Sequence, residues 1–273
     1  RGNFHHEAGG QDHNDNIPHL EKPLDEWAAE LNLKPDDLRR HIQALREKLF
    51  AVREERIHPL KDDKILTDWN GLMIASLARG GRILGDDSYT AAATKAADFL
   101  LTHLKDSQGR LLKRSRQGQA GLPAHIEDYA FAVWGLLNVY EDIYEPKYLA
   151  EAMDLTDTLL KHFWDDEKGG LFLTADDGET LLVRGKEIYD GAIPSGNSVA
   201  ALNLVRLARM TGNRDYEEKA QALLRSFSGT VEASPSGHTQ FMSALDFSVG
   251  PAYEVVICGN STPESRNLLT PLE

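Results

Sequence analysis

A helical repeat with a period near sixty residues most constrains the fold of this chain. Asp68, Asp128 and Asp190 each lead into an apolar helical segment, and these three aspartates are 60 and 62 residues apart. A turn and a second segment with helical periodicity follow each of them, which indicates stacked helical hairpins. The second helix of each unit starts at a tyrosine: Tyr89, Tyr148 and Tyr216.

The two helices of each unit differ in polarity. The first is apolar nearly all round, as in residues 72–78, whereas the second carries charged residues such as Lys95 and Asp98. A ring of buried inner helices inside a ring of half-exposed outer helices explains both patterns. Asp177-Gly178 is typical of a hairpin turn. We therefore predict an all-α fold, an (α/α) toroid of helical hairpins that is incomplete in this chain, with short β-hairpins in loops and a C-terminal strand.

The chain divides into four segments. Residues 1–22 are an irregular linker, 23–60 a helical pair and 61–250 the three α-hairpin repeats, while 251–273 combine a strand-like segment with a truncated tail. Three hairpins cannot close a six-hairpin ring, and the chain opens at Arg1 rather than at methionine, so we expect a fragment. Half a toroid exposes apolar inner helices, so we also expect a homo-dimer or another extensive interface.

The charge of the chain argues against several classes of partner. The 273 residues include 43 acidic and 30 basic ones, and the net charge of −13 disfavours binding to nucleic acid or to an anionic membrane. No apolar run approaches the roughly 20 residues that span a bilayer. The single cysteine, Cys258, forms no intrachain disulfide, so a reducing compartment fits and we predict a cytoplasmic location.

In a toroid of this kind the starts of all inner helices lie on one rim. Asp68, Asp128 and Asp190 would meet there, beside aromatic and amide side chains. Carboxylates among aromatic platforms suit a polyhydroxylated ligand, and two carboxylates across a cleft are what glycoside hydrolysis requires. The residues expected beside the aspartates are Trp69, Asn70, Tyr129, Ser195 and Asn197.

The roles follow from this expected arrangement. Asp128 and Asp190 are the expected acid/base pair, and Glu127 supports that pair or serves as an alternative acid. His125 is a candidate general base that a neighbouring carboxylate orients. The expected substrate-binding residues are Trp69 and Tyr129 as stacking platforms, with Asp68, Asn70, His125, Ser195 and Asn197 as polar contacts.

A structural interpretation of the same residues stays open. Asp and Ser are favoured N-cap residues, because their oxygens accept hydrogen bonds from free N–H groups of the first helical turn. Aromatic residues at helix starts equally suit core packing. Carboxylates that are buried and saturated by backbone N–H groups would indicate capping, whereas carboxylates in an open cleft with aromatic walls would indicate an enzyme.

We expect neither a metal nor another cofactor. The first 22 residues are rich in histidine, but the spacing matches no ligand pattern and no helix holds the side chains in place. These histidines are His5, His6, His13 and His19. Nothing beside Cys258 indicates a lowered thiol pKa, so this residue suits packing in the strand-like segment.

Several ordered motifs resemble one protein family. The chain is similar over essentially its whole length to the YyaL-type proteins, which are related to the spermatogenesis-associated thioredoxin-domain proteins. The resemblance implies a thioredoxin-like domain upstream of this chain and an (α/α) toroid similar to six-hairpin glycosidases and N-acylglucosamine 2-epimerases. The motifs are residues 62–73, 127–131, 190–198 and 255–259, with residues 2–4 and 16–20 fitting the family's linker.

The candidate residues fit this family unequally. Asp128 and Asp190 match its motifs. Position 68 is loosely occupied in the family, which lowers Asp68 as a catalytic residue and raises Asn70 as a positioning group. His125 stands where the family more often has an aromatic residue, which weakens a shared role as general base.

The sequence therefore predicts a carbohydrate-active enzyme domain, glycosidase-like or epimerase-like, that acts on a carbohydrate or another polyhydroxylated small molecule. An epimerase would need paired histidines at the rim, where this chain offers His125 alone. The alternative is a non-catalytic α/α toroid that serves as a binding platform for the thioredoxin-like domain or for a partner protein.

Overall fold

The computed structural model describes residues 4–5, 17–18, 20–251, 253 and 255. The chain forms two compact units, residues 1–62 and residues 63–273, each of which is described by itself. Within the described residues, no helix has both the length and the apolar character needed to cross a membrane.

The first unit contains the predicted helical pair. Pro35 occupies the first turn of the longer helix, where its missing N–H group costs no hydrogen bond. Along the apolar stripe of that helix Leu38 is buried, whereas Leu45 and Leu49 are 54% and 67% exposed. The elements are β1 (Phe4–His5), antiparallel to β2 (Ile17–Pro18), followed by α1 (Leu24–Glu30) and α2 (Pro35–Glu54).

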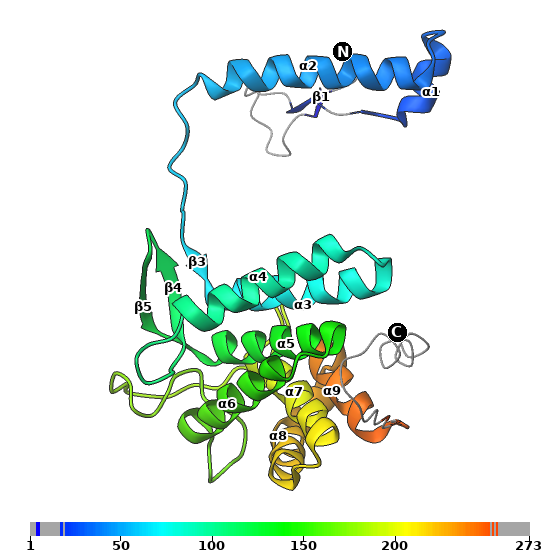
Figure 1. Ribbon diagram of the computed structural model, residues 1–273. Coiled ribbons are helices and arrows are strands. Elements are labelled where there is room, and N and C mark those ends of the chain that lie inside the picture. The colour runs from blue at the N-terminus through cyan, green and yellow to red at the C-terminus, as the bar shows by residue number, and fades with distance from the viewer. Residues whose placement is uncertain (1–3, 6–16, 19, 252, 254, 256–273) are drawn as a thin grey trace. The chain divides into compact units, whose positions relative to one another are not determined.

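The second unit is built from helical hairpins, as the sequence predicts (Figure 1). A three-stranded antiparallel sheet, in the order β3-β4-β5, lies beside the first hairpin. The hairpins are α3 (Thr67–Leu84) with α4 (Asp87–His103), α5 (Ile126–Ile143) with α6 (Pro146–Phe163), and α7 (Gly196–Thr211) with α8 (Arg214–Ala233); α9 (Thr239–Val249) follows, and the strands are β3 (Ile65–Leu66), β4 (Leu112–Arg116) and β5 (Gln119–Pro123).

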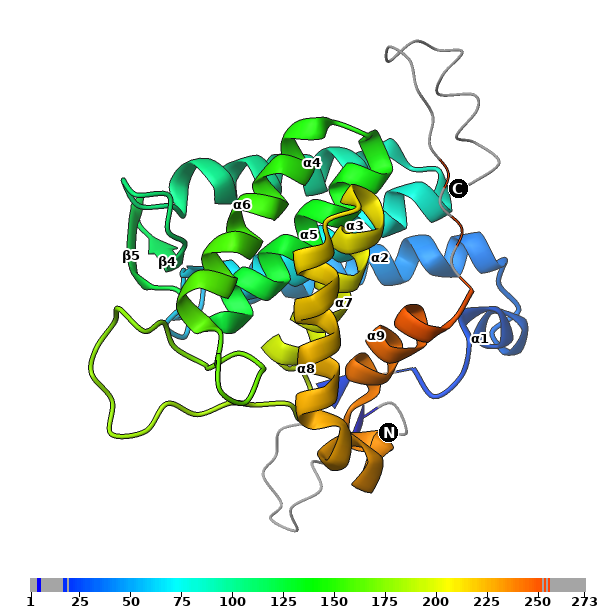
Figure 2. The ribbon, with the colours of Figure 1, turned by 90° about the horizontal axis from the view of Figure 1, so that it is seen from below.

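The predicted division into inner and outer helices is confirmed for the second and third hairpins. The inner helices α5 and α7 are buried along most of their length, whereas the outer helices α6 and α8 bury one side only. Inner helix packs on inner helix in the order α3, α5, α7 and α9 (Figure 2). The short turn η1 (Pro235–Gly237) leads into α9, a helix that the three predicted hairpin repeats do not include.

The three leading aspartates do not mark equivalent positions when the hairpins are aligned by their structure. The inner helix of each hairpin, α3, α5 or α7, ends at a residue in the left-handed conformation, Gly85, Tyr144 or Gly212, with φ of 63°, 55° and 68°. These caps are 59 and 68 residues apart, as are the tyrosines of the outer helices. The second interval is longer because the connection at 164–195 exceeds the one at 104–125. Asp128 and Asp190 therefore do not occupy equivalent positions.

The β-structure differs in place from the sequence prediction. A hairpin joins β4 to β5 through Gln117 and Gly118, whose φ angles of 51° and 77° suit a two-residue hairpin turn. Residues 177–178, where a hairpin turn was predicted, form a turn without flanking strands. The predicted C-terminal strand around Val256 lies outside the described residues, as do three of the four N-terminal histidines, His6, His13 and His19.

Candidate functional site at the starts of the inner helices

Hydrogen bonds between neighbouring helix starts bring the predicted site residues to one end of the hairpins. Asp128 in the first turn of α5 bonds to the start of α3, and Asp190, just before α7, bonds to the start of α9. At Gly196 an added side chain would meet Ile126 at 2.9 Å, so the starts of α5 and α7 are also in contact. This common end of the four inner helices, hereafter the rim, is the candidate site.

Asp128 lies at the centre of this network and is fully buried. Its carboxylate accepts hydrogen bonds from the backbone N–H of His125 at 2.7 Å and of Asp68 at 3.1 Å. The ammonium group of Lys113 lies 3.1 Å away. Burial raises the pKa of Asp128 to about 6, although the hydrogen bond from His125 and the charge of Lys113 oppose the rise. The carboxylate is thus turned into the protein and hydrogen-bonded on both oxygens.

Lys113 of β4 connects two of the three predicted aspartates. Its Nζ atom lies 3.2 Å from Asp68 and 3.1 Å from Asp128. Burial alone would lower the pKa of Lys113, but the two carboxylates outweigh burial and raise it. Lys113 therefore stays charged at the rim. Sequence analysis missed this residue, because nothing in a strand 45 residues beyond Asp68 signals that the two side chains meet.

Glu127 differs from its neighbour Asp128. It is partly exposed, and burial raises its pKa, with Lys113 acting against the rise. Among the described residues its carboxyl group is bonded only by its own backbone N–H. Glu127 therefore combines a raised pKa with carboxyl oxygens that accept no hydrogen bond from any other described residue.

His125 is the exposed residue that precedes α5. Partial burial and the nearby charge of Lys113 both lower its pKa, while Asp68 opposes them. A lowered pKa keeps the imidazole neutral near neutral pH, so that one ring nitrogen can accept a proton.

The two predicted aromatic platforms have different environments. Trp69 is 62% exposed at the rim, as a stacking surface must be. Tyr129 is 1% exposed, and its hydroxyl accepts hydrogen bonds from the backbone N–H of Leu111 at 3.1 Å and from Arg110 at 3.2 Å. Its ring packs against Phe163. Tyr129 therefore holds the loop after α4 and presents no ring face at the surface.

Asp190 accepts hydrogen bonds from three backbone groups. Its carboxylate binds the N–H of Ser195 at 2.9 Å, of Gln240 at 2.8 Å and of Phe241 at 3.1 Å. It thereby ties the entry of α7 to the first turn of α9. The hydroxyl of Ser195 caps α7 by accepting from the N–H of Ser198.

The two predicted amide residues bond to backbone groups. Asn197 is fully buried; its Oδ1 accepts from the N–H of Leu171, and its Nδ2 donates to the carbonyls of Leu171 and Glu187, all within 2.9 Å. Asn70 donates to the carbonyl of Leu66 at 2.7 Å. Of the predicted site residues, Trp69 and His125 are therefore exposed, while Asp68, Asn70, Glu127 and Asp190 are partly exposed.

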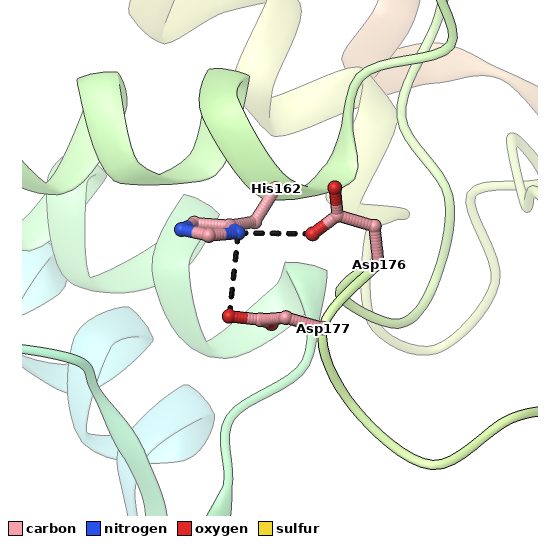
Figure 3. Close-up of side chains that lie close together, drawn as sticks. All are labelled: His162, Asp176 and Asp177. Atoms are coloured by element: carbon pink, nitrogen blue, oxygen red, sulfur yellow. Dashed lines mark hydrogen bonds and ion pairs between the residues drawn. The ribbon is translucent and has the colours of Figure 1, made fainter.

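A second charged cluster joins the last turn of α6 to the loop that follows it (Figure 3). His162 Nδ1 is 2.9 Å from Asp176 and 3.4 Å from Asp177, and the ligand atoms of all three lie within 4.8 Å of one another. These side chains are of the types that bind divalent cations. The guanidinium of Arg110 already binds Asp177 at 2.6 Å. We interpret the cluster as ion pairs that tie this loop to the one before β4.

The relatives of the chain are consistent with this fold. No family model matches the chain. Human spermatogenesis-associated protein 20 is 37% identical over 264 residues, which cover 93% of this chain and 34% of the human protein. The chain is a homologue of spermatogenesis-associated protein 20. The mouse protein of the same name is 36% identical over 97% of this chain and 35% of its own length. This homologue thus spans about a third of the curated relatives that it matches.

Solved structures with the same arrangement of helices are carbohydrate enzymes. A GH76 alpha-mannanase from Bacteroides thetaiotaomicron superimposes with a TM-score of 0.51 at 18% identity, over 64% of this chain and 46% of its own. Cellobiose 2-epimerase from Spirochaeta thermophila gives a TM-score of 0.51 at 19% identity, over 62% and 44%. These likenesses show that the hairpins have the fold of (α/α) toroid glycosidases and epimerases, as predicted.

Proposed function

We propose that this chain forms part of a carbohydrate-active site in which Glu127 at the rim transfers a proton to or from a bound sugar. The observation that carries the proposal is the half-buried carboxyl group of Glu127, whose pKa is raised and whose oxygens no other described residue occupies. The activities named for the GH76 alpha-mannanase and the cellobiose 2-epimerase support a carbohydrate as the substrate class.

The chemistry follows from the pKa of Glu127. A carboxyl group that keeps its proton closer to neutral pH can donate it to a glycosidic or ring oxygen, and the resulting carboxylate can take a proton back. Trp69, which is exposed at the start of the neighbouring helix α3, offers a ring face for the apolar side of a sugar. His125, with its lowered pKa, is available as a neutral acceptor.

The predicted acid/base pair of Asp128 and Asp190 has a different place in this proposal. Both carboxylates accept hydrogen bonds from the backbone N–H groups of other helix starts. To contact a sugar they would have to give up these bonds, at about 1–3 kcal/mol for each N–H left unsatisfied. We therefore propose that Asp128 and Asp190 position the rim and that Glu127 contacts the substrate.

Substrate binding by the full-length protein, with and without Glu127→Gln, tests this proposal. We expect cellobiose or an α-mannan oligosaccharide to raise its Tm and to be turned over, and Glu127→Gln to lower turnover by 10²–10⁴-fold while the Tm shift persists. Glu217→Gln, an exposed glutamate of α8, is the matched control and should leave turnover unchanged. Turnover that survives in Glu127→Gln would contradict the assignment of Glu127.

The second candidate function is a non-catalytic platform for the thioredoxin-like domain that the family resemblance implies. The saturation of Asp128 and Asp190 by backbone N–H groups favours this candidate. In that case neither cellobiose nor the α-mannan oligosaccharide would change the Tm of the full-length protein, whereas deletion of the thioredoxin-like domain would lower that Tm.

A further inference from the structure

The last part of the connection from α6 to α7, residues 187–190, runs along the rim and is hereafter called the strap. The carbonyl of Glu187, its first residue, accepts a hydrogen bond of 2.9 Å from the buried side chain of Asn197 in the first turn of α7. Asp190, its last residue, binds the first turn of α9 with its carboxylate and donates its backbone N–H to the carbonyl of Gly237 at 2.8 Å. The second unit by itself therefore fixes both ends of the strap.

Glu187 lies in the part of the rim where the starts of α5 and α7 touch. A side chain at Gly196 would meet Ile126 at 2.9 Å, so these two residues are in contact. Glu127 follows Ile126 in α5, and the residue after Gly196 is Asn197, which bonds the carbonyl of Glu187. The negative charge of Glu187 accordingly acts on the carboxyl group of Glu127 and helps to raise its pKa. The strap thus brings a second glutamate to the proposed proton donor.

The carboxylate of Glu187 is held in one orientation. Its Oε1 atom accepts hydrogen bonds from the backbone N–H of Ile188 at 2.9 Å and of Tyr189 at 2.8 Å. Its Oε2 atom accepts no hydrogen bond within the part of the chain that the structure describes, and the residue is exposed. One carboxylate oxygen is therefore anchored, while the other is available to a ligand.

The three aspartates of the rim differ from these two glutamates. Both carboxylate oxygens of Asp68, Asp128 and Asp190 accept hydrogen bonds, from backbone N–H groups or from a lysine. Each glutamate instead keeps a carboxyl oxygen that no other described residue bonds. Glycoside hydrolysis uses two carboxyl groups in different environments, one that gives a proton and one that takes a proton. The half-buried Glu127 and the exposed Glu187 meet this requirement.

We propose that Glu187 is the general base of the site and works with Glu127, as general acid, in the hydrolysis of a glycosidic bond; this inference rests on the proposed function of Glu127. Glu187 takes a proton from a water molecule, whose oxygen forms a bond to the anomeric carbon of the sugar. The bond from this carbon to the leaving oxygen breaks, and that oxygen keeps the electron pair and takes the proton of Glu127. The step ends with the proton on Glu187 and a carboxylate at Glu127, and exchange of protons with water restores the pair.

Turnover of cellobiose or an α-mannan oligosaccharide by the full-length protein tests this proposal. We expect Glu187→Ala to lower hydrolysis by about 10²–10⁴-fold. Azide needs no general base, so it should restore part of the rate to this variant and yield a glycosyl azide with the anomeric configuration opposite to that of the substrate. Glu179→Ala, which changes an exposed glutamate of the same connection, is the matched control and should keep the wild-type rate with and without azide.

The outcomes separate this inference from the proposed function. Hydrolysis that persists in Glu187→Ala, or a loss that azide does not relieve, would overturn the inference alone. Epimerisation of the sugar by the wild type without hydrolysis would also overturn it, while proton transfer by Glu127 would stand. Absence of any turnover in the wild type would overturn the proposed function and this inference together.

The pH profile of the azide reaction gives an independent test of where Glu187 lies. The basic limb of that profile reports the loss of the proton from Glu127. In Glu187→Ala with azide this limb should lie at lower pH than in the wild type, because a negative charge that favours protonated Glu127 is gone. Lys113 and Asp68, which also act on Glu127, stay in place. A limb at the wild-type pH, as expected for Glu179→Ala, would show that Glu187 does not act on Glu127 and would overturn the inference.

Discussion

The starts of α5 and α7 occupy the same place in successive hairpins and differ in chemistry. At the spacing of 68 residues Glu127 corresponds to Ser195, Asp128 to Gly196 and Tyr129 to Asn197. Tyr129 and Asn197 have the same structural role. Each side chain accepts a hydrogen bond from a backbone N–H in the loop after the preceding outer helix, that of Leu111 or Leu171 respectively.

The difference lies in charge. The start of α7 is capped by Ser195 and bonded by one carboxylate, Asp190, whose partners among the described residues are backbone N–H groups. The start of α5 instead holds two carboxylates of raised pKa beside the ammonium group of Lys113. Both starts share a loop clamp and a carboxylate bonded by backbone N–H groups, whereas Glu127 has no counterpart at α7, which is why we place the proposed chemistry at α5.

The largest effect on stability is expected at the start of α7. Asn197→Ala removes three hydrogen bonds and leaves two buried backbone groups of Leu171, together with the carbonyl of Glu187, without this partner, so we expect a loss of about 3–5 kcal/mol in the free energy of unfolding. Urea unfolding measures it. Ser243→Ala, which removes one exposed bond to the carbonyl of Thr239, should change stability by less than about 0.5 kcal/mol. A comparably small effect of Asn197→Ala would contradict its role as a clamp.

The next effect is expected at the charged start. Lys113→Met removes the cation that faces Asp128 and Asp68, and we expect a loss of about 2–3 kcal/mol at neutral pH, because the buried carboxylate loses its counter-charge. Urea unfolding at pH 7 and at pH 4.5 separates the causes. The loss should shrink at pH 4.5, where Asp128 is protonated. Lys95→Met, on an exposed position of α4, is the control and should be nearly silent. A loss that is equal at both pH values would point to packing rather than charge.

The third effect is the pH dependence that Asp128 confers on stability. Its folded pKa of about 6 lies above the unfolded value near 3.8, so between these values only the unfolded state releases the proton. The contribution of Asp128 to the free energy of unfolding is therefore present at low pH and falls by about 1–3 kcal/mol as the pH rises from about 4 to 6.5. The unfolding free energy of the wild type minus that of Asp128→Asn should therefore decrease as the pH is raised through this range. Parallel curves for the two proteins would contradict the raised pKa.

The smallest effect on stability is expected for Glu127→Gln. No other described residue bonds to this carboxyl group, and its raised pKa shows that burial disfavours its charged form. The neutral amide should therefore leave the unfolding free energy within about 0.5 kcal/mol of the wild type, or raise it slightly. A destabilisation above about 1 kcal/mol in thermal or urea unfolding would show that Glu127, like Asp128, serves the fold.

The comparison also explains what sequence reasoning missed at the rim. Asp128 lies in the first turn of α5, whereas Asp190 lies five residues before the cap Ser195 and bonds both to Ser195 and to the first turn of α9. The sequence alone predicts Tyr129 to be an exposed stacking platform, but in the structure the loop after α4 covers it and bonds its hydroxyl. The spacing of the aspartates along the sequence does not identify equivalent positions, because a longer loop between two hairpins changes which residues are structurally equivalent.

The sequence by itself determined the helices, their pairing into hairpins and the division into inner and outer rows. Helix formation and amphipathicity depend on residues three and four apart, which the sequence displays directly. Only the tertiary structure decided that Asp128 is buried beside Lys113, and that among the described residues the carboxyl group of Glu127 is bonded by its own backbone N–H alone. Burial, and the pKa changes it causes, depend on which distant segments cover a residue, and no local spacing carries that information.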